Sequence, residues 1–173
     1  MLSEIQKKVL IQIAKTFKEN NISFKITGGL AAIVYGAKRK LFDIDIEVLK
    51  KYIQKIRKLF KKYITEDIHH LQNERFDIYV MSLDINGVVI DISQVEESYV
   101  IDKNGNKIGG ENSLNKAKLM KIDRIEVPIE DKDELIKYKK ILNRDTDLID
   151  IEQMTKRYEV KNLTWLNHKL SQM

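Results

Sequence analysis

Residues 25–48 read Lys25-Ile-Thr-Gly-Gly-Leu-Ala-Ala-Ile-Val-Tyr-Gly-Ala-Lys-Arg-Lys-Leu-Phe-Asp-Ile-Asp-Ile-Glu-Val48, and this stretch decides the fold. Apolar, β-favouring residues precede the pair Gly28-Gly29, and a compact apolar segment over 30–35 follows it. After a basic turn, apolar and acidic residues alternate over 42–48. This order predicts a strand, a glycine turn, a short helix and a second strand.

The second predicted strand carries two acids on one face. Because side chains alternate along a strand, Asp43 and Asp45 project side by side, about 6.6 Å apart at Cα, while Ile44 and Ile46 point into a core. Two carboxylates on one face repel each other, so one of them keeps its proton unless a cation compensates. The natural compensation is a hard divalent ion, usually Mg²⁺, which takes oxygen ligands. We therefore expect a metal site on this strand.

The glycine pair opens the short predicted helix. The free N–H groups and the positive dipole end at a helix N-terminus favour a phosphate. Gly28 and Gly29 are therefore predicted to cradle a phosphate directly before the metal-binding strand. A phosphate cradle beside a metal site is what a nucleotide-using enzyme needs.

A hairpin further along the chain offers a third acid. Asn86-Gly87 is the preferred two-residue turn between predicted strands over 76–83 and 85–93. Asp91 interrupts the apolar run of the second of these strands, and a lone acid there needs solvent or a partner. Asp77, on the preceding strand, is the competing candidate for the third acid. The alternative without a functional role is that Asp91 is an exposed residue at the edge of the sheet.

These residues resemble the nucleotidyltransferase superfamily, whose signature is a Gly-Gly or Gly-Ser pair, a short helix, and then Asp-hydrophobic-Asp-hydrophobic. Here the pair is followed by thirteen residues and then by Asp-Ile-Asp-Ile over 43–46. The chain most resembles the stand-alone bacterial and archaeal members related to AbiEii-type toxins. Those commonly read Thr-Gly-Gly and then Arg-x-Thr-x-Asp-Ile-Asp; Thr27 and Arg39 match this pattern, whereas Leu41 stands at the usual Thr position.

The resemblance implies an α/β (α+β) nucleotidyltransferase fold, with a mixed β-sheet, helices mainly on one side and a C-terminal helical segment. It implies transfer of an NMP from an NTP such as ATP to an acceptor hydroxyl, with release of pyrophosphate. It also implies two Mg²⁺ ions, about 3.5–4 Å apart. The superfamily expects its third metal-binding carboxylate at a position such as Asp91. The implied catalytic and metal-binding residues are Asp43, Asp45 and Asp91, and the implied nucleotide-binding residues are Gly28, Gly29, Arg39 and Lys139.

A pattern late in the chain also resembles these relatives. They carry Leu-x-x-x-Lys, then Arg and two Asp at three-residue steps, matched here by Leu135, Lys139, Arg144, Asp147 and Asp150. On a helical wheel Lys139 falls on the apolar side, where it either snorkels outward or reaches an anionic ligand; in the relatives this lysine approaches the nucleotide phosphates. Arg144 can pair with Asp147 on one helix face, so the late Arg and Asp residues are interpreted as mainly structural.

The remaining predicted elements supply packing. We expect helices over 3–20, 50–63, from Asp131 or Asp133 to 142, and over 162–170 with Trp165 as an anchor; a hairpin at 104–105; and a last strand over 122–127 ending before Pro128. Residues 95–121 add nothing specific to the resemblance.

The outer face of helix 50–62 carries seven Lys and Arg and no acid, which predicts either a solvated face or contact with a polyanion such as RNA. His69-His70 lacks a partner pattern, so no zinc site is expected.

Length and composition limit the number of domains, the location and the chemistry to be expected. A chain of 173 residues is expected to form one domain over 1–173, with a core at about 22–130 and C-terminal helices at about 131–173. No run approaches ~18 apolar residues and the N-terminus lacks a leader pattern, so a cytoplasmic location without membrane contact is expected. The absence of cysteine excludes disulfides, Cys-ligated zinc and thiol nucleophiles. A net charge of +5 only mildly favours anionic partners.

The acceptor stays open at this point. The resemblance allows a tRNA 3′ end, a hydroxyl on a partner protein, or a small molecule such as an antibiotic. It also allows a toxin–antitoxin component held by an antitoxin partner. The alternative is a catalytically inert nucleotide- or RNA-binding module on the same fold, which Leu41 favours. A purely structural partner-binding protein would leave the clustered acids unexplained.

Overall fold

The predicted strand–helix–strand unit forms the centre of the molecule. The computed structural model describes residues 2–110 and 113–156. In it, β1 (Phe24–Ile26) leads into α2 (Gly28–Tyr35), and β2 (Asp43–Val48) returns antiparallel to β1. Gly36 ends α2 in the left-handed region, with φ of 117°, which favours glycine. The sequence reading of this unit is therefore confirmed.

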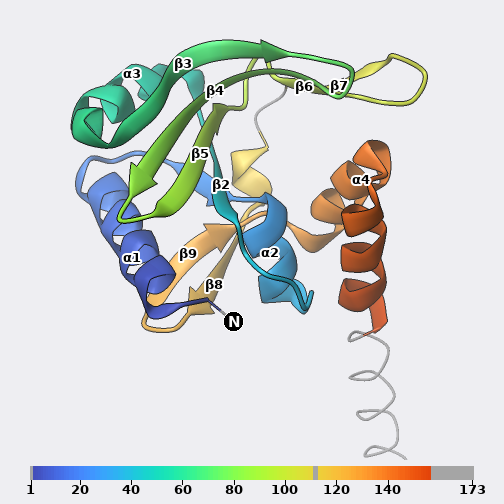
Figure 1. Cartoon of the computed structure of the whole chain (residues 1–173), viewed down its shortest axis with the longest axis horizontal. Helices are drawn as coiled ribbons and strands as arrows, with labels where there is room; N and C mark the ends of the chain where they lie inside the picture. The colour runs from blue at the N-terminus through green and yellow to red at the C-terminus, as the bar shows by residue number, and fades with distance from the viewer. Residues whose placement is uncertain (1, 111–112, 157–173) are drawn as a thin grey trace, which may run out of the picture.

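A nine-stranded mixed sheet grows outward from this unit (Figure 1). Its strand order is β7-β6-β4-β5-β2-β1-β9-β8. β3 lies outside this order and pairs with β4. β2 runs parallel to β5 and β1 parallel to β9, whereas the other pairs are antiparallel. The additional strands are β3 (Ile64–Gln72), β4 (Phe76–Ile85), β5 (Val88–Gln94), β6 (Tyr99–Ile101), β7 (Lys107–Gly109), β8 (Lys118–Ile122) and β9 (Ile125–Ile129).

Two helices cover the apolar face of the sheet. They are α1 (Glu4–Glu19) and α3 (Lys50–Leu59), which lie on the left in Figure 1. α1 begins at the predicted N-cap Ser3, which forms a capping box with Gln6. Phe17 of α1 packs edge-on against Phe24 and Phe60, with ring centroids 5.1 and 6.0 Å away. The side chains of β2 alternate between this core and the opposite face, as its burial pattern shows.

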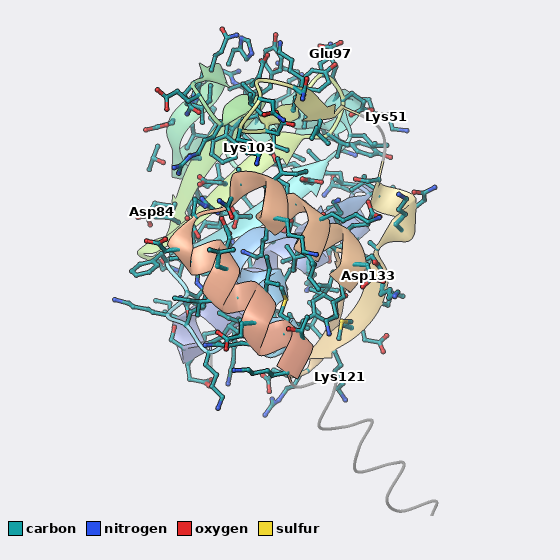
Figure 2. All side chains as sticks on the ribbon, turned by 90° about the vertical axis from the view of Figure 1, so that its right-hand side faces the viewer. Lys51, Asp84, Glu97, Lys103, Lys121 and Asp133 are labelled. Atoms are coloured by element: carbon teal, nitrogen blue, oxygen red, sulfur yellow. The ribbon has the colours of Figure 1, made fainter. Side chains whose placement is uncertain are left out.

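The C-terminal helical segment lies on the opposite side of the sheet. It consists of α4 (Lys132–Leu142) and a helix described over residues 145–156. Figure 2 looks onto these two helices, which lie in front of the strands. Asp131 caps α4 by accepting from the N–H groups of Asp133 and Glu134, which decides between the two predicted caps. The mixed sheet, its helices and the C-terminal helical segment confirm the predicted fold class.

Several predicted elements need correction. β3 was not expected, and helix 50–63 is α-helical only to Leu59, followed by a 3₁₀ turn over Lys61–Tyr63. The single strand predicted over 122–127 is wrong: β8 and β9 form a hairpin, because Asp123 adopts a positive φ of 54° between them. Pro128 lies inside β9, opposite Leu119, since its fixed φ is compatible with extended backbone. The helix predicted over 162–170 lies outside the described residues.

No helix among the described residues is long and apolar enough to cross a membrane.

Candidate active site

Three aspartates converge on the face of the sheet opposite α1 and α3. One carboxylate oxygen from each of Asp43, Asp45 and Asp91 lies within 4.8 Å of the other two. Among the described residues this is the group of His, Cys, Asp and Glu side chains that could hold a metal ion. The two acids of β2 and the acid of β5 therefore meet as the sequence predicts, whereas their chemical roles remain predictions.

Strand register produces this convergence. β2 and β5 are parallel and in register, so Asp45 lies directly opposite Asp91. The apolar residues between the acids, Ile44 and Ile46 on β2, pair with Ile90 and Ile92 on β5 and are fully buried in the core. Because these isoleucines fix which face of each strand points inward, the acids are held together on the outer face.

The electrostatics of the cluster fit a bound cation. Burial and the neighbouring Asp43 carboxylate raise the pKa of Asp45 from 3.8 to about 6, although the Gly29 N–H acts in the opposite direction. Asp91 raises this pKa further and Lys139 lowers it. A site of oxygen ligands in which acids oppose each other's ionisation suits a divalent metal ion, because the ion neutralises all of them at once.

The glycine pair contacts the acid cluster directly. The Gly29 N–H donates to Asp45 Oδ2 at 3.4 Å. Gly28 has a φ of +59°, and a Cβ added there would lie only 1.9 Å from Asp45 Oδ2. Glycine is therefore required at position 28 both for its backbone conformation and for the close approach of the Asp45 carboxylate.

Arg39 and Lys139 belong to one chain of ion pairs. Arg39 Nη1 contacts Asp150 at 3.0 Å, and Lys139 Nζ bridges Asp150 at 2.9 Å and Asp147 at 3.0 Å. Arg144 closes the chain by donating from Nε to Asp147 at 2.6 Å. The pairing of Arg144 with Asp147 agrees with the structural interpretation of these residues.

Lys139 neither extends outward to solvent nor points freely toward a ligand, the two positions that the sequence left open. Its side chain is 1% exposed, so it does not snorkel outward, and its ammonium is held by two buried carboxylates. Arg39 keeps a quarter of its side chain exposed, and its guanidinium carbon lies 3.6 Å from the point where a Cβ of Gly29 would stand. Arg39 is thus the more accessible cation beside the N-terminus of α2.

The competing acid, Asp77, lies elsewhere. It pairs with His70 and Lys107 on strands β3 and β7, and its pKa is lowered by hydrogen bonds from Lys107 and His70. The ring of His70 also stacks on Tyr79, with centroids 4.5 Å apart. Asp77 is therefore not part of the acid cluster, and His70 is engaged with an acid rather than with another histidine.

Two neighbours of the cluster were not predicted. Ser82 Oγ donates to Asp91 Oδ1 at 2.6 Å, and the two residues face each other across the β4–β5 hairpin. The two-residue turn at 86–87 fixes this register, so counting back from the turn could have identified Ser82. Tyr138 of α4 lies near Asp45 and Glu47, and its burial raises the pKa of its hydroxyl; no local sequence signal marked it.

A cavity of about 530 Å³ opens beside the cluster. Its lining includes Glu47 and Ser93. Each lies two residues after an aspartate of the cluster, Asp45 on β2 and Asp91 on β5, and therefore on the same face of its strand. α4 and the β6–β7 hairpin form other walls of this cavity. Asp43, Asp45 and Asp91 are not part of the lining, but Glu47 and Ser93 place a space large enough for a small molecule next to them along β2 and β5.

The basic face of α3 is partly neutralised by acids from other elements. Lys50 pairs with Glu97 at 2.6 Å, and Arg57 pairs with Asp67 at 2.5 Å. This surface therefore carries less unopposed charge than the sequence of the helix indicates.

The fold is shared with solved structures of nucleotidyltransferases. A protein from Thermotoga maritima, TM1012, assigned to the nucleotidyltransferases, has the same fold: the TM-score is 0.73 at 17% identity, over 97% of this chain and 96% of that one. ANT(2″)-Ia, in a complex with adenylyl-2″-tobramycin, aligns with a TM-score of 0.61 at 12% identity, over 96% of this chain and 97% of that one.

The family is established by sequence. The model of the aminoglycoside-2″-adenylyltransferase family matches residues 9–154, and the chain belongs to this family. It is therefore a nucleotidyltransferase, which transfers an NMP. Among curated proteins, none matches the chain significantly. The predicted superfamily is confirmed, whereas the narrower AbiEii-type likeness stays a prediction.

Proposed function

We propose that this nucleotidyltransferase depends on divalent metal ions, expected to be two Mg²⁺, held by Asp43, Asp45 and Asp91. The observation that carries the proposal is the convergence of their carboxylates within 4.8 Å from two strands. When bound, such ions would neutralise the three carboxylates and polarise the phosphoryl oxygens of the nucleotide. The raised pKa of Asp45, which burial and Asp43 cause, supports a cation at this point.

The chain's own groups are proposed to bind the triphosphate of the NTP, for which ATP is the first candidate. Gly28 and Gly29 would place the start of α2 beside the phosphates, with the Gly29 N–H shared with Asp45, and Arg39 would approach the phosphates from its partly exposed position. Lys139 would act from beneath the site, as a buried cation that favours ionised Asp45 and fixes Asp147 and Asp150. Its bonds to these acids keep it from direct contact with the phosphates in this arrangement.

Asp91 is proposed to receive the proton of the acceptor hydroxyl. It is the acid contributed by the second strand, and Ser82 holds one of its oxygens through a hydrogen bond of 2.6 Å. A carboxylate held in one orientation can serve as a general base if the acceptor hydroxyl comes within hydrogen-bonding distance. The cavity lined by Ser93, two residues along β5 from Asp91, would supply a place for that acceptor.

A small molecule is the acceptor class that we favour. The family is that of aminoglycoside-2″-adenylyltransferases, and ANT(2″)-Ia has been captured with adenylyl-2″-tobramycin. The cavity falls within the usual size range of small-molecule sites, about 300–1,000 Å³. A tRNA or protein acceptor, and a toxin–antitoxin role with an antitoxin partner, stay predictions, because no contact among the described residues singles them out.

Label transfer tests this proposal. The purified chain is incubated with Mg²⁺ and each α-³²P-labelled NTP, together with a small-molecule hydroxyl panel, total tRNA or a cell lysate. We expect labelled product that requires Mg²⁺, is lost in Asp45→Asn, and is retained in Asp133→Asn, an exposed acid at the start of α4 (Figure 2). NTP binding without transfer in every mixture would instead identify an inert nucleotide-binding module.

A further inference from the structure

Glu130 contacts both ends of the helix that begins at the glycine pair. Its Oε2 accepts a hydrogen bond from the hydroxyl of Thr27, the residue before α2. Its main-chain oxygen accepts a hydrogen bond of 2.8 Å from Oη of Tyr35, the last residue of α2. Glu130 directly follows β9, and its side chain is buried. A single buried residue therefore ties both ends of α2 to the sheet.

Glu130 is itself fixed to the central strands. Its N–H donates to Ile26 O at 2.8 Å, which extends the pairing of β9 with β1. Its Oε1 lies 3.2 Å from Nζ of the buried Lys25, which also contacts Glu47 of β2 at 2.9 Å. Burial raises the pKa of the Glu130 carboxyl, and the contacts with Lys25 and Thr27 oppose that rise. A carboxylate that moved away would lose its buried cationic partner, which is strongly unfavourable, so β1 and β2 determine its position.

Thr27 uses its hydroxyl for Glu130 and not for its own helix. Thr27 is the N-cap residue of α2, where a threonine oxygen usually accepts from N–H groups of the first turn. Here the side chain makes no capping hydrogen bond, because its hydroxyl donates to Glu130. The cap side chain therefore does not occupy the N–H groups of the first turn, as a phosphate bound at this turn requires.

The start of α2 is also the part of the helix that contacts the acid cluster. The Gly29 N–H lies 3.4 Å from Asp45 Oδ2, and a Cβ added at Gly28 would lie 1.9 Å from the same oxygen. A shift of Thr27 would therefore move both glycines relative to this carboxylate. Displacing reacting groups by about 1 Å can cost on the order of 10²-fold in rate. The placement of Thr27 thus affects the chemistry and not only the stability of the fold.

We propose that Glu130 is a positioning residue of the nucleotide site. Through its hydrogen bond with Thr27, it fixes the start of α2 relative to Asp45, so that the turn meets the phosphates without rearrangement. This proposal rests on the proposed function, because it requires the triphosphate to bind at the glycine pair. Glu130 acts through Thr27 and does not itself contact the nucleotide.

Titration calorimetry with matched threonine variants tests this proposal. The full chain is titrated with a non-hydrolysable ATP analogue in the presence of Mg²⁺, at a temperature where circular dichroism shows each variant to be folded. Thr27→Val replaces the hydroxyl by a methyl group, and we expect the analogue to bind about tenfold more weakly, the usual effect of losing one hydrogen bond to a charged group. Thr27→Ser keeps a hydroxyl at this position, and we expect binding within about twofold of wild type.

Two further variants serve as controls. Thr16→Val removes a hydroxyl that donates to Gln12 O at 2.9 Å in α1, and Tyr35→Phe removes the hydrogen bond between Glu130 and the far end of α2. Both should bind the analogue within about twofold of wild type. Unchanged binding in Thr27→Val, equally weak binding in Thr27→Ser, or equal weakening by either control overturns the proposal. Failure of the wild type to bind the analogue counts against the proposed function, so the two failures are distinguishable.

Glu130→Gln decides the question if Thr27→Val does not fold. The glutamine keeps the shape of the side chain and an acceptor oxygen, but it loses the charge that pairs with Lys25. We expect Glu130→Gln to bind the analogue about threefold more weakly, and unchanged binding overturns the proposal. Where both variants fold, the double variant should bind within about twofold of Thr27→Val alone, because both changes act on one hydrogen bond. Effects that multiply independently overturn the proposal.

Discussion

Asp45 and Asp91 lie directly opposite each other on the parallel strands β2 and β5, and their carboxylates share one small region with that of Asp43. Like charges in directly opposed positions on a sheet are destabilising. The chain keeps them there because the isoleucines that flank each acid along its strand fill the core on the other face. The arrangement is therefore unfavourable in the absence of a cation, and this has measurable consequences.

The first consequence is a pH-dependent effect of Mg²⁺ on stability. Burial and Asp43 raise the pKa of Asp45 to about 6 from 3.8, so the metal-free folded chain binds a proton that the unfolded chain has lost. The stability contributed by this proton is fully present below about pH 4 and is lost as the pH rises through about 6, on the order of 3 kcal/mol. We expect Mg²⁺ to raise the melting temperature at pH 7.5 and to have little effect at pH 5.

Calorimetry of the wild type and of Asp45→Asn checks this expectation. The variant carries a neutral side chain at every pH, so its response to Mg²⁺ should be small and nearly independent of pH. An equal Mg²⁺ effect at both pH values in the wild type would argue against a proton shared with the metal site.

A second prediction concerns the close approach of Gly28 to Asp45. Gly28→Ala places a Cβ 1.9 Å from Asp45 Oδ2 and forces alanine into a φ of +59°. We expect a loss of about 2–5 kcal/mol in the free energy of unfolding, measured by urea denaturation, and a loss of the Mg²⁺ response. Gly87→Ala is the matched control, because Gly87 also has a positive φ, of +78°, but no atom lies within 4 Å of the added Cβ.

The control should lose only the strain of the left-handed conformation, about 1–2 kcal/mol, and keep its response to Mg²⁺. Similar losses in the two alanine variants, with the Mg²⁺ response intact in both, would mean that position 28 is only a turn.

A third prediction concerns the buried ion pairs of α4. Lys139→Met leaves Asp147 and Asp150 without their shared partner, and both side chains are almost completely buried. We expect a loss of about 3–5 kcal/mol in the free energy of unfolding, because the two buried carboxylates lose the buried cation between them and keep only the partly exposed Arg144 and Arg39. Lys140→Met, one residue along on the exposed face, should change stability by only about 0.5 kcal/mol.

Adding Asp147→Asn and Asp150→Asn to Lys139→Met separates charge from packing. Partial recovery of stability is expected, since the two carboxylates no longer need a cation. A triple variant that is less stable than Lys139→Met would show that side-chain shape, and not charge, holds this junction together.

Much of the site could be predicted from local patterns. Alternation placed Asp43 and Asp45 on one face, and the Asn86-Gly87 turn fixed the hairpin that presents Asp91. These features depend on residues close together in the sequence, where strand period and turn type act directly. The same turn also determines that Ser82 faces Asp91.

The features that escaped prediction depend on long-range docking or on weak patterning. β3 reads Ile-Thr-Glu-Asp-Ile-His-His-Leu-Gln with register shifts against β4, so no simple alternation marks it. The contact of Lys25 with Glu130 joins residues 105 positions apart and exists only because β9 pairs with β1. Lys139 was placed correctly on the inner side of its helix, but its partners Asp147 and Asp150 were set by how the next helix packs.

The most direct test of the account is a titration of the chain with Mn²⁺, followed by electron paramagnetic resonance in the presence of a non-hydrolysable ATP analogue. We predict that wild-type protein binds the ion, that Asp91→Asn weakens this binding at least tenfold, and that Asp77→Asn leaves it unchanged, because Asp77 pairs with His70 and Lys107 away from the cluster. Unchanged binding in Asp91→Asn would contradict the claim that acids from two strands hold one shared metal site.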